Sequence, residues 1–325
     1  MLNKESNKSL IICLTPLQVL IAKEIVKINP SQNFDFILIT NNKNDKYIYY
    51  YNLLKEVCSK SYLYTFTWST ELENFLNFLK FKKEINLKFN FKDYSSLYIA
   101  SIDSRHIQYI VSRLSNNAEI CTFDDGLANI VKNSIYIKDK INMLKKIIFL
   151  MLGIRFNLVD IKKRSNLHYT IYNLKNNVSD KTKRIDLLDT SFLKEKKSRK
   201  TVKIFIGQPY SELLGKDFNE IYEILNKLKV DFYFPHPRET QVDKIQANVI
   251  KTNLVFEDYI LNYIKETGCD VEVYSFLSSA AANVINIKSV SVNILYNEYL
   301  YSKYSDMYLL FKEMGAEIIN YGVKS

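Results

Sequence analysis

The sequence predicts an α/β fold built from two Rossmann-like β/α domains in tandem. Short apolar runs alternate with segments of helical periodicity along most of the chain, and the alternation stops at one charged stretch and then restarts. Alternation of this kind is typical of parallel sheets covered by helices. The length of 325 residues also fits two domains, at about 150 residues each.

The first half opens with a strand, a tight turn and a helix. Residues 9–14, SLIICL, are mostly apolar, as in a buried parallel strand. Pro16 suits the first turn of the helix that follows, and Thr15 suits its cap. The other strands expected in this half are 34–40, 61–68, 96–101, 118–123 and 167–171. The other helices expected here are 47–57, 71–81 and 104–114.

The charged stretch KEKKSRK, residues 194–200, is the expected linker. It gives an N-terminal domain of residues 1–195 and a C-terminal domain of residues 196–325. The strands expected after it are 201–207, 230–237, 270–276 and 289–295. The helices expected after it are 218–228, 256–266, one from 278 and one from about 305, the last a candidate to pack back on the first domain.

The chain carries a net charge of +10, which has two interpretations. It indicates either a lysine-rich solvated surface or attraction to an anionic partner, such as acidic lipid or a phosphorylated substrate. Nucleic acid is disfavoured, because no arginine-rich tract or basic–aromatic alternation is present.

Cysteine and histidine spacing disfavours both disulfides and metal sites. Three cysteines, in or beside apolar runs, are expected to be buried, and the absence of a disulfide framework favours a reducing cytoplasm. They are Cys13, Cys121 and Cys269, and the fourth cysteine is Cys58. The histidines lie far apart without ligand spacing, so no metal is expected. They are His106, His168 and His236.

No apolar run reaches the roughly 18 to 20 residues that a membrane span needs, and the N-terminus does not resemble a signal peptide. Residues 141–156, INMLKKIIFLMLGIRF, come nearest to a span. They indicate either a core or partner-facing helix, for instance in a homodimer, or an interfacial helix at the inner-membrane surface.

Polar residues recur where the predicted strands end. In open parallel sheets, ligands gather at the carboxyl ends of the strands. The candidates are Thr15, Asp124, Asp125, Gly207, Gln208, His236, Ser278 and Ser279. The chain has no G-x-G-x-x-G and no Walker A lysine loop, which disfavours dinucleotide dehydrogenases and P-loop NTPases. Two Rossmann-like halves facing a central cleft form the glycosyltransferase B (GT-B) architecture.

The stretch TFDDGLANI places Asp124 and Asp125 directly after a strand and before Gly126. Its structural interpretation is a tight turn with a helix cap, assisted by Asn129. Its functional interpretation is a general base, because two adjacent carboxylates repel one another and raise one pKa. Neighbouring side chains diverge, so we expect only one of the two carboxylates to face the cleft.

The second half offers three weaker signals. His236, held between two prolines, either packs at a strand end or donates to an anionic leaving group. Arg238 either assists it or pairs with Glu239. Ser278-Ser279 is either a plain N-cap or a phosphate site at a helix N-terminus. Gly207 either ends a strand or lets the backbone approach a ligand.

The order of these motifs resembles that of bacterial sialyltransferases. Asp124-Asp125-Gly126, His236-Pro237 and Ser278-Ser279 match an acidic pair with glycine, a His-Pro and a serine pair. The stretches LIICLTPLQVLIA and FDDGLANI resemble glycosyltransferase family 52 in particular, which includes lipooligosaccharide and capsule sialyltransferases. The resemblance extends from Leu10 to about Leu295.

This resemblance implies an inverting, metal-independent transfer of sialic acid from CMP-sialic acid to a galactoside, without a cofactor. The second half would bind CMP and the first half the acceptor. CMP-binding candidates are then Gly207, Gln208, His236, Pro237, Glu257, Ser278 and Ser279, with Thr15 and Gln18 on the acceptor side. Glu257 would contact the ribose hydroxyls, or would simply be a first-turn helix carboxylate.

The identity of the base stays open at this point. We prefer Asp124, with Asp125 as the alternative in the acidic pair and Glu212 or Asp217, upstream of the His-Pro, as further contenders. Two other functions also remain: a GT-B enzyme that uses another nucleotide sugar, and a non-catalytic nucleotide- or nucleic-acid-binding module.

Overall fold

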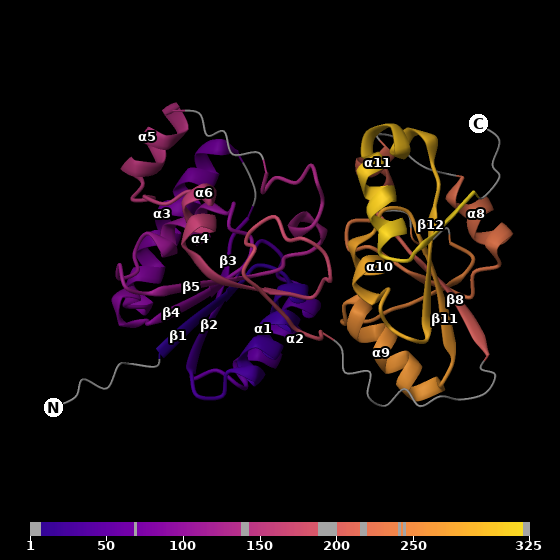
Figure 1. The fold of residues 1–325 in the computed structure, drawn as a ribbon, viewed down its shortest axis with the longest axis horizontal. Coiled ribbons are helices and arrows are strands. Elements are labelled where there is room, and N and C mark those ends of the chain that lie inside the picture. Colours follow the sequence, from indigo (N-terminus) through magenta and orange to yellow (C-terminus); the bar gives the residue numbers. More distant parts are fainter. Residues whose placement is uncertain are drawn as a thin grey trace. The chain divides into compact units, whose positions relative to one another are not determined.

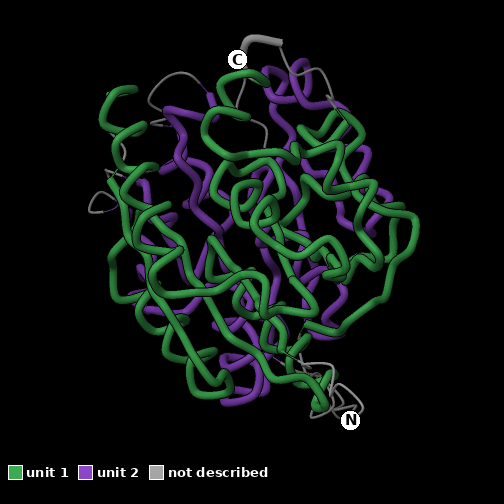
Figure 2. The backbone as a smooth tube through the Cα atoms, turned by 90° about the vertical axis from the view of Figure 1, so that its left-hand side faces the viewer, with its two compact units in different colours: residues 1–187 green, residues 188–325 purple. Residues whose placement is uncertain are grey.

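The computed structural model describes residues 8–67, 70–137, 143–187, 200–214, 220–239, 242 and 245–320, without the side chains of residues 143–145. The chain forms two compact units, residues 1–187 and 188–325, which Figure 2 colours separately. The expected linker lies outside the described residues except for Lys200, so a boundary at 195/196 stays a prediction.

The first unit has a parallel sheet whose described strands run in the order β3-β2-β1-β4-β5-β6-β7. The strands are β1 Lys8–Cys13, β2 Asn33–Thr40, β3 Lys60–Thr65, β4 Ser96–Ile99, β5 Glu119–Phe123, β6 Ser165–Thr170 and β7 Thr182–Arg184. Six of them follow the Rossmann order, with a switch point between β1 and β4. The short edge strand β7 was not predicted, because its three residues TKR carry no apolar signal.

Helices cover both faces of this sheet. They are α1 Pro16–Ile28, α2 Asp45–Lys55, α3 Glu71–Lys88, α4 Arg105–Val111, α5 Met143–Met151 and α6 Leu158–Arg164, with 3-10 turns at Phe91–Asp93 and Leu127–Asn129. Helices α1 and α2 lie on one face, and α3, α4 and α6 on the other (Figure 1). Thr15 caps α1 as predicted, since its hydroxyl accepts from the Gln18 N–H at 3.3 Å. Helix α3 runs past the expected end because Ile85 continues the buried stripe of Phe78 and Phe81.

The second unit repeats this plan with the order β10-β9-β8-β11-β12-β13. Its strands are β8 Thr201–Ile206, β9 Phe232–Phe234, β10 Asn248–Val249, β11 Asp270–Ser275, β12 Val290–Leu295 and β13 Glu317–Ile319. Its helices are α7 Tyr210–Leu214, α8 Ile221–Leu228, α9 Phe256–Thr267, α10 Ser279–Val284 and α11 Glu298–Glu313. Helices α9 and α10 lie on one face of the sheet and α8 on the other (Figure 1). Both units therefore have the expected Rossmann-like architecture.

Three details differ from the predictions. Helix α11 begins at Glu298 rather than near 305, because Asn297 caps it, and a non-helical Tyr304 lies inside it. Strand β9 ends at Phe234, so His236 lies in a loop rather than at the strand's last residue. Cys269 is half-buried, unlike the buried Cys13 and Cys121, because it follows the helix-ending Gly268.

Candidate active site

Asp124 is a fully buried carboxylate with four hydrogen-bond donors. Its Oδ1 accepts from His168 Nε2 at 2.8 Å and from Asn176 Nδ2 at 3.1 Å. Its Oδ2 accepts from the Thr170 hydroxyl at 2.7 Å and from the Ile171 N–H at 2.8 Å. With both oxygens doubly occupied and no exposed surface, this carboxylate is suited to hold the end of β5 against β6.

Behind Asp124 lies a buried network that sequence reasoning missed. Ring atom Nδ1 of His168 lies 2.8 Å from the Thr122 hydroxyl, which lies 2.7 Å from the Ser165 hydroxyl. His168 stands opposite Thr122 because the β5–β6 register shifts between Ile120 and Cys121. No sequence spacing could have paired these residues, since His168 and Asp124 are 44 residues apart.

Asp125 has a different environment from its neighbour. Its Oδ2 accepts a short hydrogen bond from the Tyr136 hydroxyl and a longer one, 3.3 Å, from the Ser101 hydroxyl. Its Oδ1 is buried without a hydrogen-bond partner among the described residues. The Asn129 side chain accepts from the Asp125 N–H at 2.9 Å, which fixes the turn as expected.

Burial raises the pKa of Asp125 to about 6. The Tyr136 hydrogen bond opposes this shift, and the charges of Asp103 and Asp124 add to it. The direction of the shift is the predicted one, and the predicted repulsion from Asp124 contributes to it, but burial is the larger cause. A carboxylate with this pKa is ionised at neutral pH and still basic enough to accept a proton.

Gly126 makes the turn possible. Its φ of +131° lies in a region that side-chain-bearing residues rarely adopt. The chain can therefore turn sharply after Asp125 and enter the 3-10 turn that carries Asn129.

Of the two residues predicted for the acceptor side, Gln18 contacts this cluster through Ser101. Buried Gln18 accepts from the Leu14 N–H at 2.6 Å, and its Nε2 donates to the Ser101 hydroxyl at 2.8 Å. Thr15 acts as the helix cap. Ser101, at the end of β4, has a φ of +45°, a strained conformation for a serine. The ends of β1, β4 and β5 therefore bring Gln18, Ser101 and Asp125 together at the switch point, as the sheet topology requires.

In the second unit the loops after β8 and β9 meet at Glu239. The Glu239 carboxylate accepts from the Gln208 N–H at 3.1 Å and from the His236 N–H at 2.7 Å. The Tyr233 hydroxyl donates to it at 2.5 Å. A Cβ at Gly207 would lie 2.5 Å from the Tyr233 hydroxyl and 2.8 Å from a Glu239 oxygen, so a larger residue would displace these side chains.

His236 is half-buried, and its Nδ1 accepts from the Arg238 N–H at 3.2 Å. The neutral imidazole therefore carries its proton on Nε2, as a donor. The predicted pairing of Arg238 with Glu239 was wrong. Arg238 instead pairs with Glu212 at 2.6 Å in an exposed ion pair, because Glu239 turns inward to the backbone N–H groups.

The remaining predicted residues follow β11 or begin α9. Ser278 is buried at the start of α10 without a side-chain cap bond, and Ser279 is exposed. Glu257 is buried in the first turn of α9 and accepts from Asn283 of α10 at 2.7 Å. This contact links the two helices, which fits the structural interpretation of Glu257. Pro237 is exposed, and Asp217 lies outside the described residues.

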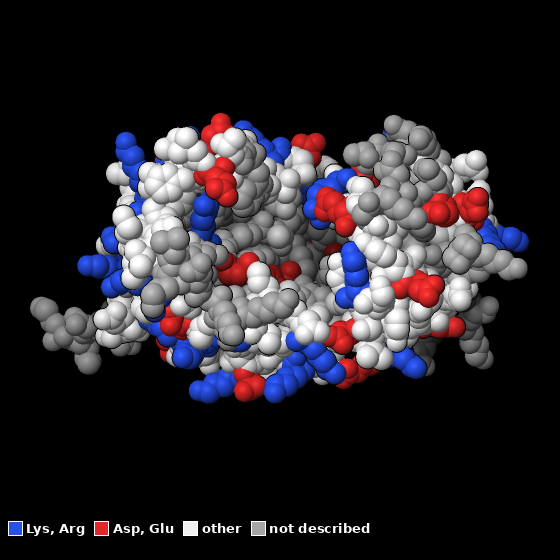
Figure 3. Space-filling view, turned by 90° about the horizontal axis from the view of Figure 1, so that it is seen from above, with Lys and Arg blue, Asp and Glu red and all other residues white. Residues whose placement is uncertain are grey.

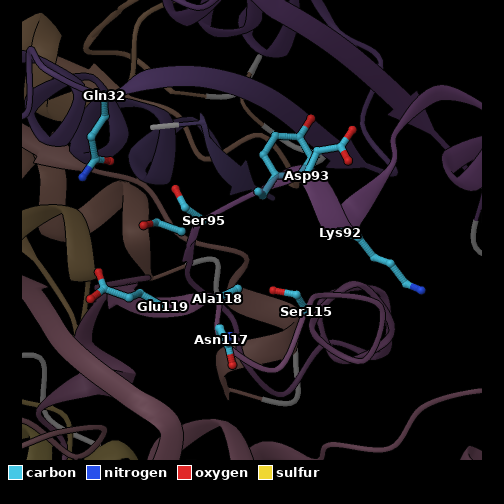
Figure 4. Close-up of a pocket in the computed structure, with 10 residues that line it drawn as sticks. Gln32, Lys92, Asp93, Ser95, Ser115, Asn117, Ala118 and Glu119 are labelled. Carbon is cyan, nitrogen blue, oxygen red and sulfur yellow. The ribbon is translucent and has the colours of Figure 1, made fainter. Parts of the chain in front are cut away.

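A polar pocket of about 490 Å³ lies at the opposite edge of the first sheet (Figure 4). It is lined by residues at the amino ends of β4 and β5, among them Ser96 and Glu119. Its position separates it from Asp125.

Charge and hydropathy add two observations. On the face shown in Figure 3, Lys and Arg side chains are scattered among Asp and Glu rather than gathered in one patch. None of the helices in the described part of the chain is long and apolar enough to cross a membrane.

The sequence model of glycosyltransferase family 52 matches residues 31–298. The chain belongs to this family. It is therefore a glycosyltransferase, as the motif order suggested.

Relatives with curated names are similar over nearly the whole chain. A CMP-N-acetylneuraminate:β-galactoside α-2,3-sialyltransferase of Pasteurella multocida is 31% identical over 317 residues, 96% of this chain and 99% of the relative. An N-acetyllactosaminide α-2,3-sialyltransferase of Haemophilus influenzae is 28% identical over 94% of this chain and its own full length. One of Neisseria meningitidis is 30% identical over 97% of this chain and 86% of its own.

Solved structures are similar in fold alone. The spinosyn rhamnosyltransferase SpnG with thymidine diphosphate has a TM-score of 0.54 at 8% identity and covers 96% of this chain and 85% of its own. The kitacinnamycin glycotransferase has a TM-score of 0.52 at 8% identity, over 98% and 87% of the two chains. These glycosyltransferases have the GT-B fold, and the family 52 chain shares it.

Proposed function

We propose that this family 52 enzyme transfers sialic acid from CMP-sialic acid to the 3-hydroxyl of a terminal galactoside. Support comes from relatives named α-2,3-sialyltransferases that match nearly the whole chain. The geometric observation that carries the proposal is Asp125, whose buried Oδ1 has no partner among the described residues and whose pKa is raised to about 6.

We assign the role of general base to Asp125 rather than to Asp124, the residue that the sequence favoured. The acceptor hydroxyl attacks C2 of sialic acid, the bond from C2 to the CMP phosphate oxygen breaks, and Asp125 takes the hydroxyl proton. One displacement of this kind inverts the configuration at C2. Asp124 has no oxygen left for this task, because four donors already occupy it. Its role is to hold the strand end that carries Asp125.

The leaving CMP carries negative charge, and we propose that His236 neutralises it. Because His236 Nδ1 accepts from the Arg238 N–H, its Nε2–H is the donor for a phosphate oxygen. The Ser278 and Ser279 hydroxyls and the backbone at the start of α10 are further donors. We propose that these groups replace a metal and that the transfer needs no cofactor. Activity should therefore survive dialysis against EDTA, and a loss restored by Mg²⁺ would contradict this part.

We also propose that the acceptor belongs to a lipooligosaccharide or capsular glycan and that the enzyme contacts the cytoplasmic face of the inner membrane. Helix α5 supports this, because one side of it is exposed and apolar and basic residues accompany it. The apolar residues are Ile147, Ile148, Leu150 and Met151. The basic residues are Lys146 in the helix and Arg155 shortly after it. A mixed apolar and basic surface suits anionic lipid.

A vesicle assay tests the membrane contact. The enzyme should sediment with vesicles containing phosphatidylglycerol and not with pure phosphatidylcholine, and salt should weaken the binding. If the enzyme stays in the supernatant with both kinds of vesicle and forms a dimer in analytical ultracentrifugation, a second copy of the chain is favoured as the partner of the exposed side of α5.

The activity itself is tested with CMP-sialic acid and lactose. We expect 3′-sialyllactose, identified by mass spectrometry and linkage analysis, and CMP should raise the melting temperature more than UDP does. If neither product nor donor hydrolysis forms but a UDP-sugar supports transfer, the enzyme uses a different nucleotide sugar. A protein without turnover whose ligand binding is unaffected by loss of His236 would instead be a binding module.

A further inference from the structure

Glu239 joins two loops at the carboxyl edge of the second sheet. One oxygen accepts from the Gln208 N–H in the loop after β8, and the other accepts from the His236 N–H in the loop after β9. The Tyr233 hydroxyl fills a further acceptor position. One carboxylate thus fixes the distance between the Gly207-Gln208 loop and His236.

A carboxylate suits this position. All three partners are donors, and a carboxylate is the side chain that accepts at both of its oxygens. Gly207 completes the arrangement, because a Cβ there would meet both the Tyr233 hydroxyl and the Glu239 oxygens. Burial raises the pKa of Glu239, and its hydrogen bonds to Tyr233, His236 and Gln208 oppose that rise only in part.

Gln208 gives this loop a second feature. Its side chain is buried, and its Oε1 has no hydrogen-bond partner among the described residues. A buried acceptor without a donor is costly unless a ligand or water supplies one. The loop that Glu239 holds therefore carries an acceptor available to a nucleotide hydroxyl or amino group.

We propose that Glu239 is a positioning residue of the nucleotide site. It holds the His236 imidazole and the Gly207-Gln208 backbone in the relative geometry that CMP and its leaving phosphate require. This role rests on the proposed function, in which His236 neutralises the leaving group, and Glu239 acts through His236 rather than on the substrate.

The test is a double-mutant cycle of Glu239→Gln and His236→Ala. A glutamine keeps the size but has one acceptor oxygen, so one of the two loops loses its anchor. We expect kcat/KM to fall about 10- to 100-fold and CMP affinity, measured by calorimetry, to weaken by a similar factor. In the His236→Ala background, the same change should cost less than about threefold, because coupled residues are not additive.

Glu272→Gln is the matched control. Glu272 also accepts from a tyrosine hydroxyl, that of Tyr274 at 2.7 Å in β11, but no backbone N–H of another loop donates to it among the described contacts. We expect this variant to keep kcat/KM within about twofold. If Glu239→Gln fails to fold, Gly207→Ala approaches the same contact from the other side and should weaken CMP binding in the same way.

The outcomes separate the two proposals. If Glu239→Gln binds CMP like the wild-type protein, or if its effect multiplies with that of His236→Ala, the positioning role is wrong. If the wild-type protein binds CMP but makes no sialyllactose, the proposed function is wrong, and Glu239 is still judged by CMP binding. If the wild-type protein binds UDP instead of CMP, the affinities of the double-mutant cycle are measured with UDP. If it binds neither nucleotide, both proposals are wrong.

Discussion

The two units share a strand order, and each places a hydrogen-bonded carboxylate near a residue to which we assign a catalytic role. In the first unit Asp124 stands beside Asp125, and in the second Glu239 stands near His236. They differ in where the donors come from. Asp124 is held mainly by side chains of β6 and the loop after it, 44 to 52 residues away. Glu239 is held mainly by backbone N–H groups of two short loops.

This difference suggests separate roles for the two anchors. The contacts of Asp124 join two strands in the interior of a sheet, so its loss should destabilise the first unit. The contacts of Glu239 join surface loops, so its loss should disturb ligand geometry more than folding. The two residues beside these anchors also have different proposed roles. Asp125 would accept a proton, and His236 would donate a hydrogen bond to an anion.

Loss of the base should have the largest effect on turnover. Asp125→Asn keeps the shape of the side chain but removes its basicity, so kcat should fall about 10³-fold. CMP affinity, measured by calorimetry, should stay within about twofold, because the proposed nucleotide site lies in the second unit. A variant that retained a tenth of the wild-type kcat would return the role to Asp124 or Glu212.

Asp124→Asn should act chiefly on stability. An amide cannot accept from all four donors, so buried donors lose their partner, and we expect a loss of about 3–5 kcal/mol in the free energy of unfolding. Urea denaturation measures it. Asp160→Asn is the control, since among the described contacts that carboxylate accepts from one donor, the Asn157 N–H in a helix capping box, and about 1 kcal/mol is expected. Equal losses in the two variants would contradict the anchoring role.

His236→Ala should lower kcat/KM about 10²-fold, because a donor to the leaving phosphate is lost. The change should also weaken CMP binding, which distinguishes it from Asp125→Asn. Steady-state kinetics and calorimetry on the same preparations give both numbers. Unchanged CMP affinity would place the imidazole away from the nucleotide.

The pH dependence should reflect the raised pKa of Asp125. Since the carboxyl is the base only when ionised, kcat/KM should fall about tenfold per pH unit below about 6. For stability the sign is opposite: a pKa raised from 3.8 to about 6 favours the folded protein at low pH, and that contribution is lost as pH rises through 6.

Asp125→Asn should therefore be more stable than the wild-type protein at pH 8, by about 1–3 kcal/mol, and should show no such gain at pH 4. Thermal unfolding at both pH values measures the gain. A gain of the same size at both would mean that desolvation of the charge is not its cause.

Glu212→Gln should have the smallest effect. The ion pair with Arg238 is exposed, and such pairs contribute about 0–1 kcal/mol. We expect kcat/KM to change less than about threefold. A loss of 10²-fold or more would make Glu212 the base and would leave Asp125 without its proposed role.

Much of the fold was present in the sequence, because its signals are local. Apolar runs predicted the central strands of both sheets, and Thr15 predicted the start of α1. The edge strands β7 and β10 were missed, because two or three residues at a sheet edge bury too little apolar surface to leave a pattern. The sequence also predicted the loops that carry the candidate site residues, because polar residues follow the predicted strands in a recognisable order of motifs.

The sequence by itself determined that Asp124 and Asp125 end a strand and that His236 follows another. Only the tertiary structure decided which of the two carboxylates has an oxygen without a hydrogen-bond partner among the described residues. Adjacent side chains diverge at a strand end, and the donors that meet each one come from residues far along the chain, His168 for Asp124 and Tyr136 for Asp125. The same holds for Glu239, whose sequence neighbour Arg238 was a plausible partner until folding brought two backbone N–H groups to it instead.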